Sequence, residues 1–481
     1  MSQLVLFFAL QLLGSWVCIA VGPAREPVLG MALGFLIGLA VAVFLSIPLL
    51  LLGAFTSTTV SAMLLVAFAA AVGLAARRGR ATLALAVRTL IWAMAFVAQC
   101  VPFCHWDVSA MTYDSQVFVD YAIALQEMEG LPLDTLTHLH AWGSFQIIAH
   151  ALAIITGESH LYALAPAFSI SLVATFAVAL HRGLDELVVP ARRRTLVVIL
   201  VLAALLAIPL VRLHVVYIHA NWAAGGYLFV YVVLFWFADL KDDPSYLLLA
   251  FLGLLAFSFA RVESPMFVAP FLVLTLSQTR LRRAQVVGPY LAFTLVLAAW
   301  LALMAAVVPD DSIYLTPGRS LLMAATITLI FPAFLARDTA IGKWLVPFVP
   351  RLAVALLVLV LVLGAVLRFD EFSTMFLIWQ RDLWLGSFWG HVLWPTFAVL
   401  AVLSRWVEAP PFSRPLRYGI ALFFGLIVLL TILADEYGSG RYGSLTRVTL
   451  QIVPLIWFYL AITFAPAWSR LTDAKASEPI R

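Results

Sequence analysis

Carboxylates and histidines gather in one stretch of an otherwise apolar chain, between Trp106 and Gly157. Its ionisable residues are Asp107, Asp114, Asp120, Glu127, Glu129, Asp134, His138, His140 and His150. On both sides the sequence is almost unbroken Leu, Val, Ala and Phe. Ionisable side chains beside a hydrocarbon core are costly, so they indicate a functional site. A carboxylate in this setting can take a proton from an attacking alcohol, which is general base catalysis.

The elements that must hold these residues are membrane-spanning helices. Of the 481 residues, 64% are hydrophobic and only 11% are charged, whereas soluble proteins have about 25% charged residues. Apolar runs of about 20 residues fit helices, because a helix satisfies its own backbone hydrogen bonds in lipid. We therefore predict an all-α, polytopic transmembrane helical bundle of about 13–15 spans, with an outer-face loop that contains interfacial helices.

Polar and Pro/Gly punctuation divides the chain into apolar segments and loops. We place spans near 4–21, 28–53, 56–76, 83–102, 161–181, 195–211, 222–239, 245–260, 264–278, 287–307, 318–336, 349–367, 391–404, 416–434 and 446–464. The predicted organisation is an N-terminal helical group (1–102), an outer loop (103–160), a helical core (161–469) and a polar tail (470–481). Residues 1–21 lack a basic leader and a cleavage site, so we expect a first span there.

Residues 140–157 decide the topology. If this segment lies in the membrane interface without crossing, 22 of the 29 Lys and Arg residues fall on one side. If it crosses, only 12 remain there. The positive-inside rule favours the first arrangement, with Asp114 outside and the C-terminus cytoplasmic. The Ala-, Leu- and Arg-rich composition suggests a bacterial inner membrane, and the net charge of +4 needs no nucleic-acid partner.

Seven arginines then lie on the outer side. The positive-inside rule, which explains the cytoplasmic cations, does not explain these seven. They are Arg212, Arg261, Arg319, Arg368, Arg381, Arg441 and Arg447. Several stand in short polar sequences, such as RLHVVYIHANW (212–222) and ARVES (260–264). We expect them to line one outer cavity with the acidic loop. A structural interpretation stays open for each, since Arg447 can extend along a helix end and Arg261 can form a buried pair with Glu263.

The stretch from Asp114 to Gly130 has the pattern of a helix with one apolar face, formed by positions 117, 118, 121, 122, 125 and 128. Asp114 can simply cap this helix, and Asp120 and Glu127 fall on its wetter faces. The local pattern therefore leaves two interpretations open. One is an interfacial helix with solvated acids, and the other is a catalytic carboxylate at its start.

The arrangement resembles the first outer loop of the GT-C superfamily of membrane glycosyltransferases, which includes protein O-mannosyltransferases and the aminoarabinose, arabinofuranosyl and mannosyl transferases of bacterial envelopes. There, an Asp opens the loop and a Tyr/Ala-rich helix closes on Leu and Gly. The matching residues here are Asp114, Tyr121, Ala122, Ala124, Leu125, Gly130, Trp142 and Gly157. Segments 219–240 and 255–274 are similar to later family elements. This chain departs from the family in its four preceding spans, its lack of a soluble C-terminal domain and its unpaired acid.

The resemblance implies a sugar donor on a polyprenyl phosphate and a glycan or lipid-linked acceptor hydroxyl, joined with inversion on the outer face. Asp114 is the expected general base, with Asp107 second. Fixed guanidinium groups best stabilise the charge on a leaving phosphate. The expected substrate-binding residues are Arg261, Glu263, Arg441, Arg447, His219, Arg212, His138 and His140, with Glu263 orienting Arg261 or binding a sugar hydroxyl.

No cofactor is expected. Asp107 and Asp114 could offer oxygen ligands to a divalent metal, but such sites need more ligands than the sequence indicates. Cys100 and Cys104, in the sequence CVPFC, are weak candidates for a metal site or a disulfide.

Two other classes of function stay open. An O-antigen polymerase or ligase would use diphosphate-linked oligosaccharides and a late outer loop, for which 368–390 is the candidate. A lipid or sugar transporter would show matching halves with broken spans, and we find neither. A structural subunit would not need the acids and arginines of the outer side.

Overall fold

The computed structural model of the chain describes residues 3–23, 26–104, 113–127, 139, 143–155, 163–307, 316–386, 389–407, 410, 412–433 and 444–476. This part of the chain folds into helices and contains no β-strand. It divides into two compact units. Unit 1 comprises Met1–Thr175, Leu213–Val268 and Arg280–Pro332, and unit 2 comprises Phe176–Arg212, Ala269–Thr279 and Ala333–Arg481.

Unit 1 holds most of the N-terminal helices. They are α1 (Gln3–Val21), α2 (Pro27–Ala32), α3 (Gly34–Leu51), α4 (Ser57–Arg77), α5 (Leu83–Cys100), η1 (Val101–Phe103), α6 (Tyr113–Glu127), α8 (Ser144–Ile154), α12 (Ala220–Lys241), η3 (Pro244–Tyr246), α13 (Leu247–Ala260) and α15 (Arg283–Val307). Four further helices are shared between the two units along the chain: α9 (Leu164–Glu186), α11 (Pro209–Val216), α14 (Ser264–Gln278) and α16 (Pro317–Ala336).

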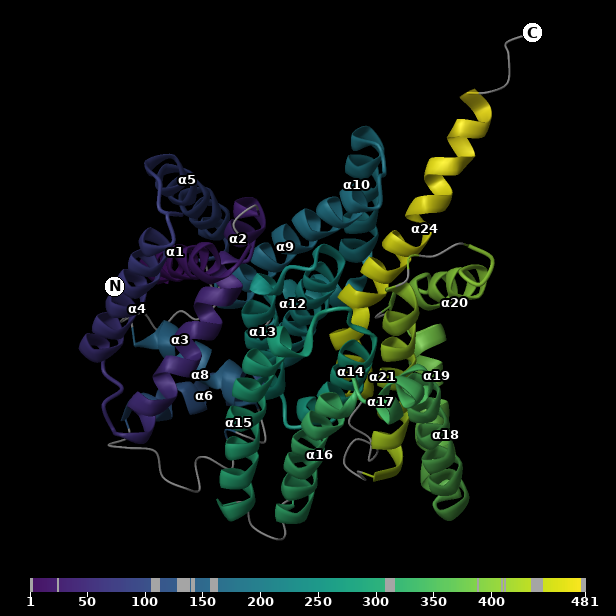
Figure 1. Cartoon of the computed structure of the whole chain (residues 1–481). Helices are drawn as coiled ribbons and strands as arrows, with labels where there is room; N and C mark the ends of the chain where they lie inside the picture. The colour runs from purple at the N-terminus through teal and green to yellow at the C-terminus, as the bar shows by residue number, and fades with distance from the viewer. Residues whose placement is uncertain are drawn as a thin grey trace. The chain divides into compact units, whose positions relative to one another are not determined.

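Unit 2 holds the remaining helices. They are α10 (Ala191–Ala207), α17 (Ala340–Leu345), η4 (Val346–Phe348), α18 (Val349–Leu367), α19 (Phe369–Leu385), α20 (Leu393–Leu403), α21 (Ser413–Leu433), α23 (Ser444–Thr449), η6 (Leu450–Ile452) and α24 (Val453–Ala476). Within this unit α18, α19 and α21 pack together (Figure 1). Most of α18 is exposed and apolar, as expected of a helix that faces lipid.

The prediction of an all-α bundle with the character of a multi-pass membrane protein is confirmed. Eleven helices in the described part of the chain are long and apolar enough to cross a membrane. The pair α10–α11 would add a twelfth if it counts as one span, although the two helices are bent by 80° at their junction.

This number is lower than the roughly 13–15 spans predicted, and it counts only helices in the described residues that meet the length and hydropathy expected of a span. The segments predicted near 245–260, 264–278 and 391–404 do form helices, but α13, α14 and α20 have 14, 15 and 11 residues. At a rise of 1.5 Å per residue, even 15 residues reach only about 23 Å, short of a hydrocarbon core of about 30 Å. The segment near 195–211 is interrupted at Ile208, just before Pro209. A proline disfavours helical geometry in the residue before it.

Two regions that were predicted to lie outside the spans contain helices. Residues 368–390, predicted as a late loop, contain the 17-residue helix α19. Residues 144–154 form α8, whose 11 residues span about 17 Å. That 140–157 lies in the interface without crossing, and on which side of the membrane, stays a prediction.

The first helices of unit 1 approach one another at the level of the backbone (Figure 1). A Cβ atom added to Gly14 of α1 would overlap the backbone of Gly34 and Gly38 of α3. Lipid offers no hydrophobic force to hold two membrane helices together, so their association depends on close van der Waals packing. Small residues such as these glycines permit that close packing. Gln11 reinforces the contact, as its Nε2 donates to the Met31 carbonyl oxygen at 2.7 Å.

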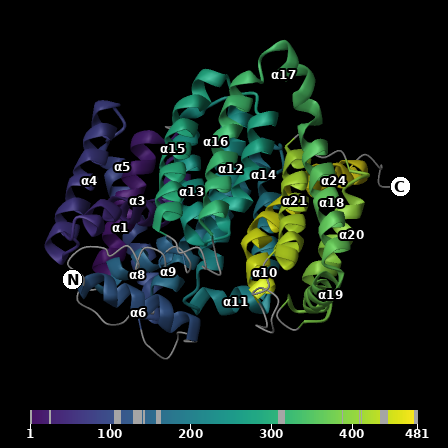
Figure 2. The same cartoon turned by 90° about the horizontal axis from the view of Figure 1, so that it is seen from below.

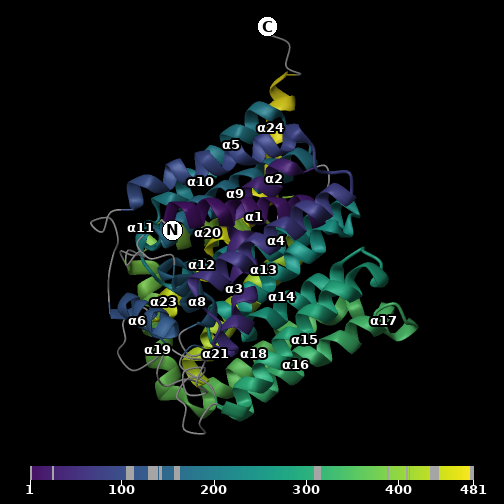
Figure 3. The same cartoon turned by 90° about the vertical axis from the view of Figure 1, so that its left-hand side faces the viewer.

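Within unit 1, α12 and α13 pack against each other as an antiparallel pair (Figure 3). All residues of α12 from Ala220 to Ala238 are buried. A Cβ on Gly253 of α13 would lie 3.0 Å from Val230 Cγ1 and 3.3 Å from the Tyr227 carbonyl oxygen. Because α12 has 22 residues, its ends lie about 33 Å apart, and α13 returns toward the start of α12. Residues near 219 and 260 therefore share one end of the pair, and residues near 241 and 246 share the other.

Candidate functional site

The first turn of α6 contacts the segment that precedes α12. The Ser115 hydroxyl donates to the Ile218 carbonyl oxygen at 3.2 Å, and Ser115 is fully buried. One turn later, the Phe118 ring lies 5.9 Å from the His219 ring and 6.5 Å from the His150 ring, measured between centroids. Residue 114 belongs to this same turn, since α6 begins at Tyr113. The helix start that carries the predicted base therefore lies beside His219.

His219 is a buried histidine with a defined tautomer. It precedes α12, and its Nδ1 accepts a hydrogen bond from the backbone N–H of Asn221 at 3.2 Å. A nitrogen that accepts carries no proton, so the neutral ring has its proton on Nε2. The Tyr217 ring stacks on it at 5.4 Å, and the His214 ring meets it edge-on at 5.8 Å. His219 can thus act as a hydrogen-bond donor through Nε2.

His150 lies on α8, which packs beside α6 (Figure 2). Its ring is fully buried, and Nδ1 lies 2.7 Å from the Gln146 carbonyl oxygen, so Nδ1 carries the proton. Nε2 has no hydrogen-bond partner among the described residues. Burial lowers the pKa of His150 to about 4, against a smaller opposing effect of the bond to Gln146. His150 is therefore neutral at physiological pH.

Arg261 and Glu263 form an ion pair just after α13. Arg261 Nε donates to Glu263 Oε1 at 3.1 Å, and the Glu263 side chain is 3% exposed. The Arg261 side chain, at 14% exposure, is also largely enclosed. The buried pair considered from the sequence is thus present, and it fixes the orientation of the Arg261 guanidinium.

Gly143 lies between the residue that precedes this ion pair and the residue that follows His219. Its φ is +113°, a backbone conformation that other residues rarely adopt, and a Cβ there would overlap the Ala260 carbonyl oxygen. The same Cβ would lie 3.7 Å from the Ala220 Cβ. Ala260 precedes Arg261, and Ala220 follows His219. We call the group formed by Ser115, Phe118, Gly143, His150, His219, Arg261 and Glu263 the His219 cluster.

Not all predicted site residues fall in this cluster. Arg212 and Arg447 belong to unit 2, where Arg212 is exposed and Arg447 is partly buried in α23. Asp107, His138, His140 and Arg441 lie outside the described residues, and of Asp114 only the helical position is described. No group of three or more His, Cys, Asp or Glu suited to a metal ion occurs in the described part of the chain.

Sequence reasoning missed an acid at the other end of unit 1. Glu26 is the only acidic residue in the first 102 positions, which was a usable signal. Its Oε1 lies 2.7 Å from Lys241 Nζ, at the end of α12 opposite to His219. The basic residues of 77–80 and Lys241 were only counted among the 22 Lys and Arg residues of the predicted cytoplasmic side, whereas in the structure Arg80 and Glu26 line one cavity.

Together these observations define the class of the molecule as a multi-pass, all-helical membrane protein with a buried polar cluster at one end of its α12–α13 pair. No protein-family model, no curated protein and no solved structure matches the chain.

Proposed function

We propose that the chain is a membrane glycosyltransferase of the GT-C type. It moves a sugar from a polyprenyl-phosphate donor to a hydroxyl of a lipid or polysaccharide on the outer face of the membrane. The observation that carries the proposal is the hydrogen bond from Ser115 to Ile218, which brings the helix start with Asp114 beside His219. Imidazole and guanidinium groups of the His219 cluster then share one region of unit 1 with the helix start to which Asp114 belongs.

In this proposal Asp114 is the general base. The acceptor oxygen forms a bond to the anomeric carbon as the bond from that carbon to the donor phosphate oxygen breaks. The hydroxyl proton passes to the Asp114 carboxylate, and the configuration at the anomeric carbon inverts. An alcohol is a weak nucleophile, so a positioned base contributes about 10²–10⁴-fold to such a reaction. Asp107 is the second candidate for this role.

The leaving polyprenyl phosphate needs positive charge and hydrogen-bond donors. Arg261 supplies a permanent charge, and its pairing with Glu263 at 3.1 Å holds the guanidinium in place before substrate arrives. Such preorganisation is the main source of electrostatic stabilisation in enzymes. His219 adds a hydrogen-bond donor through Nε2, since its Nδ1 accepts from the Asn221 backbone N–H. Arg212, Arg441, Arg447, His138 and His140 remain proposed substrate-binding residues.

The first test is the identity of lipids that co-purify with the full chain in mild detergent, measured by mass spectrometry. A polyprenyl monophosphate, bare or with one sugar, supports the proposal. Diphosphate-linked oligosaccharides would replace it with a polymerase or ligase. Recovery of neither would overturn the lipid-donor proposal.

The second test is Asp114→Asn in a transfer assay with polyprenyl-phosphate mannose, arabinose and aminoarabinose as donors. The expected loss is about 10²–10⁴-fold. Asp120→Asn is the matched control, since residue 120 is exposed on the same helix and lies outside the His219 cluster. Equal activity of the two variants would remove Asp114 from the proposed mechanism.

A further inference from the structure

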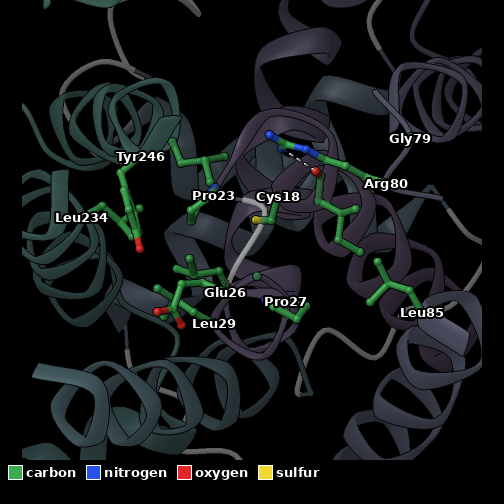
Figure 4. Close-up of a pocket in the computed structure, with 14 residues that line it drawn as sticks. Cys18, Pro23, Glu26, Pro27, Leu29, Gly79, Arg80, Leu85, Leu234 and Tyr246 are labelled. Atoms are coloured by element: carbon green, nitrogen blue, oxygen red, sulfur yellow. Dashed lines mark hydrogen bonds between the residues drawn. The ribbon is translucent and has the colours of Figure 1, made fainter. Parts of the chain in front are cut away.

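A cavity of about 230 Å³ lies at the end of the α12–α13 pair opposite to the His219 cluster (Figure 4). Its walls are mainly apolar, and the larger apolar side chains are Ile19, Leu29, Leu33, Leu85, Leu234 and Leu249. Two charged residues line it, Glu26 and Arg80. Figure 4 shows them on different sides, with the Cys18 sulfur between them in this view. The cavity lies wholly within unit 1.

The wall that holds Glu26 carries no net charge. Glu26 pairs with Lys241 at 2.7 Å, and the two side chains are 9% and 21% exposed. Tyr246 lines the same cavity and is buried. Burial is the main reason why the pKa of Tyr246 rises to about 12, so its hydroxyl stays neutral.

Arg80 provides a positive charge that no acid balances in the described part of the chain. Its Nη1 donates to the carbonyl oxygens of Ile19 at 3.0 Å and of Gly22 at 2.6 Å, at the C-terminal end of α1. Its Nε and Nη2 make no hydrogen bond with any described residue. A guanidinium has five N–H donors, so this one is held in place and has capacity for an anion.

The position of the cavity favours a membrane lipid over a soluble anion. Arg80 and Lys241 lie at the ends of the apolar helices α4 and α12, where lipid phosphates are found relative to a span. Leu85 of α5 forms one wall. Its neighbours Leu83 and Val87 are 82% and 45% exposed, as expected of a helix that faces acyl chains. The wall formed by Leu85 therefore belongs to a helix whose exposed side is apolar.

We infer that this cavity binds the phosphodiester head group of a membrane phospholipid. The phosphate contacts Arg80 through Nε and Nη2, and the glycerol and first methylenes lie against Leu29, Leu85 and Leu249. The Glu26 carboxylate in the facing wall disfavours a second negative charge. Phosphodiesters such as phosphatidylglycerol are thus preferred over phosphatidic acid. This inference does not depend on the proposed transferase function.

The test is native mass spectrometry of the full chain released from nanodiscs of phosphatidylethanolamine, phosphatidylglycerol and phosphatidic acid. Wild type is expected to retain one phospholipid per chain. Arg80→Gln should lower that retained fraction about tenfold, because a charge-assisted contact contributes about 1.4 kcal/mol or more. Arg78→Gln is the matched control. Arg78 also donates to the Ala20 carbonyl oxygen, at 2.7 Å, but does not line the cavity.

Arg80→Gln also removes the hydrogen bonds from Arg80 to the C-terminal end of α1, so a second variant tests lipid binding with those bonds in place. Leu85→Trp should fill part of the cavity and reduce retention while every charge stays in place. Equal retention by Arg80→Gln and Arg78→Gln, or full retention by Leu85→Trp, would overturn the inference. So would preferential retention of phosphatidic acid. If inorganic phosphate binds wild type but not Arg80→Gln, and no phospholipid is retained, the site is one for a soluble phosphate instead.

Discussion

The polar groups at the two ends of the α12–α13 pair have opposite surroundings. At the His219 cluster the histidines are buried among aromatic rings, and backbone meets backbone where Gly143 contacts Ala260. At the Arg80 end, charged side chains surround a cavity with apolar walls. The ion pair of the His219 cluster joins residues two positions apart, whereas Glu26 and Lys241 are separated by 215 positions.

The two surroundings suit two different functions of polar residues in a membrane protein. The His219 cluster holds preorganised groups at fixed positions, which suits chemistry on a bound substrate. The Arg80 end combines a cavity with one charge that no acid among the described residues balances, which suits binding. The following changes test whether the two ends are built on these different principles, from the largest expected effect to the smallest.

Gly143→Ala should disrupt the His219 cluster most strongly. The new Cβ would overlap the Ala260 carbonyl oxygen in a backbone conformation with φ of +113°. We expect a loss of about 3–5 kcal/mol in the free energy of unfolding, read as a large drop in the thermal midpoint. Gly73→Ala is the control, because nothing lies within 4 Å of a Cβ there and α4 should be unaffected. Similar midpoints for both variants would show that the backbone contact is not essential.

Glu26→Gln should destabilise the Arg80 end more than Glu263→Gln destabilises the His219 cluster. The first change leaves Lys241 largely enclosed without its acid and breaks a long-range contact, at a cost of about 3 kcal/mol. The second breaks a pair only two positions apart, which can also form in the unfolded chain, so about 1–2 kcal/mol is expected. Hydrogen exchange should rise in α2 and the end of α12 for Glu26→Gln only. Exchange confined to the mutated turn in both variants would contradict this.

The third prediction concerns pH and the His219 cluster alone. The pKa of His150 is about 4 in the folded protein, below its ordinary value of 6.5, because the ring is buried. As the pH falls, His150 is therefore protonated in the unfolded chain before it is protonated in the folded protein. The free energy of unfolding falls as the pH drops from about 6.5 toward 4. Between pH 7 and pH 5 the loss should be about 2 kcal/mol. His150→Gln should flatten this part of the stability profile, and an unchanged slope would assign the pH dependence to other groups.

The helices of this fold were largely predictable, whereas their lengths as spans were not. Hydropathy located α13 and α14 within a few residues, because apolar composition persists across 245–278. Both segments were nevertheless predicted as spans, although their 14 and 15 residues are fewer than the roughly 20 that a spanning helix needs. Apolar character reports burial in protein or lipid alike, and α13 is buried in protein.

The candidate site was predictable only in part. The sequence indicated Asp114, His219, Arg261 and Glu263 by residue type, but their proximity depends on contacts across about a hundred positions, as between Ser115 and Ile218. The role of Gly143 depends on its φ, which no local pattern revealed. Lys241 looked like an orienting cation because its partner, Glu26, lies far away in sequence.

The close approach of α1 and α3 also bears on how the protein is made. All residues of that contact lie within the first 51 positions, so both helices are complete before most of the chain has been synthesised. In the bilayer this pair can dock while the later helices are still leaving the ribosome. In the folded protein Tyr227 of α12 donates to the Leu36 carbonyl oxygen of α3 at 2.9 Å. A docked pair of α1 and α3 would therefore already offer this acceptor when α12 is synthesised.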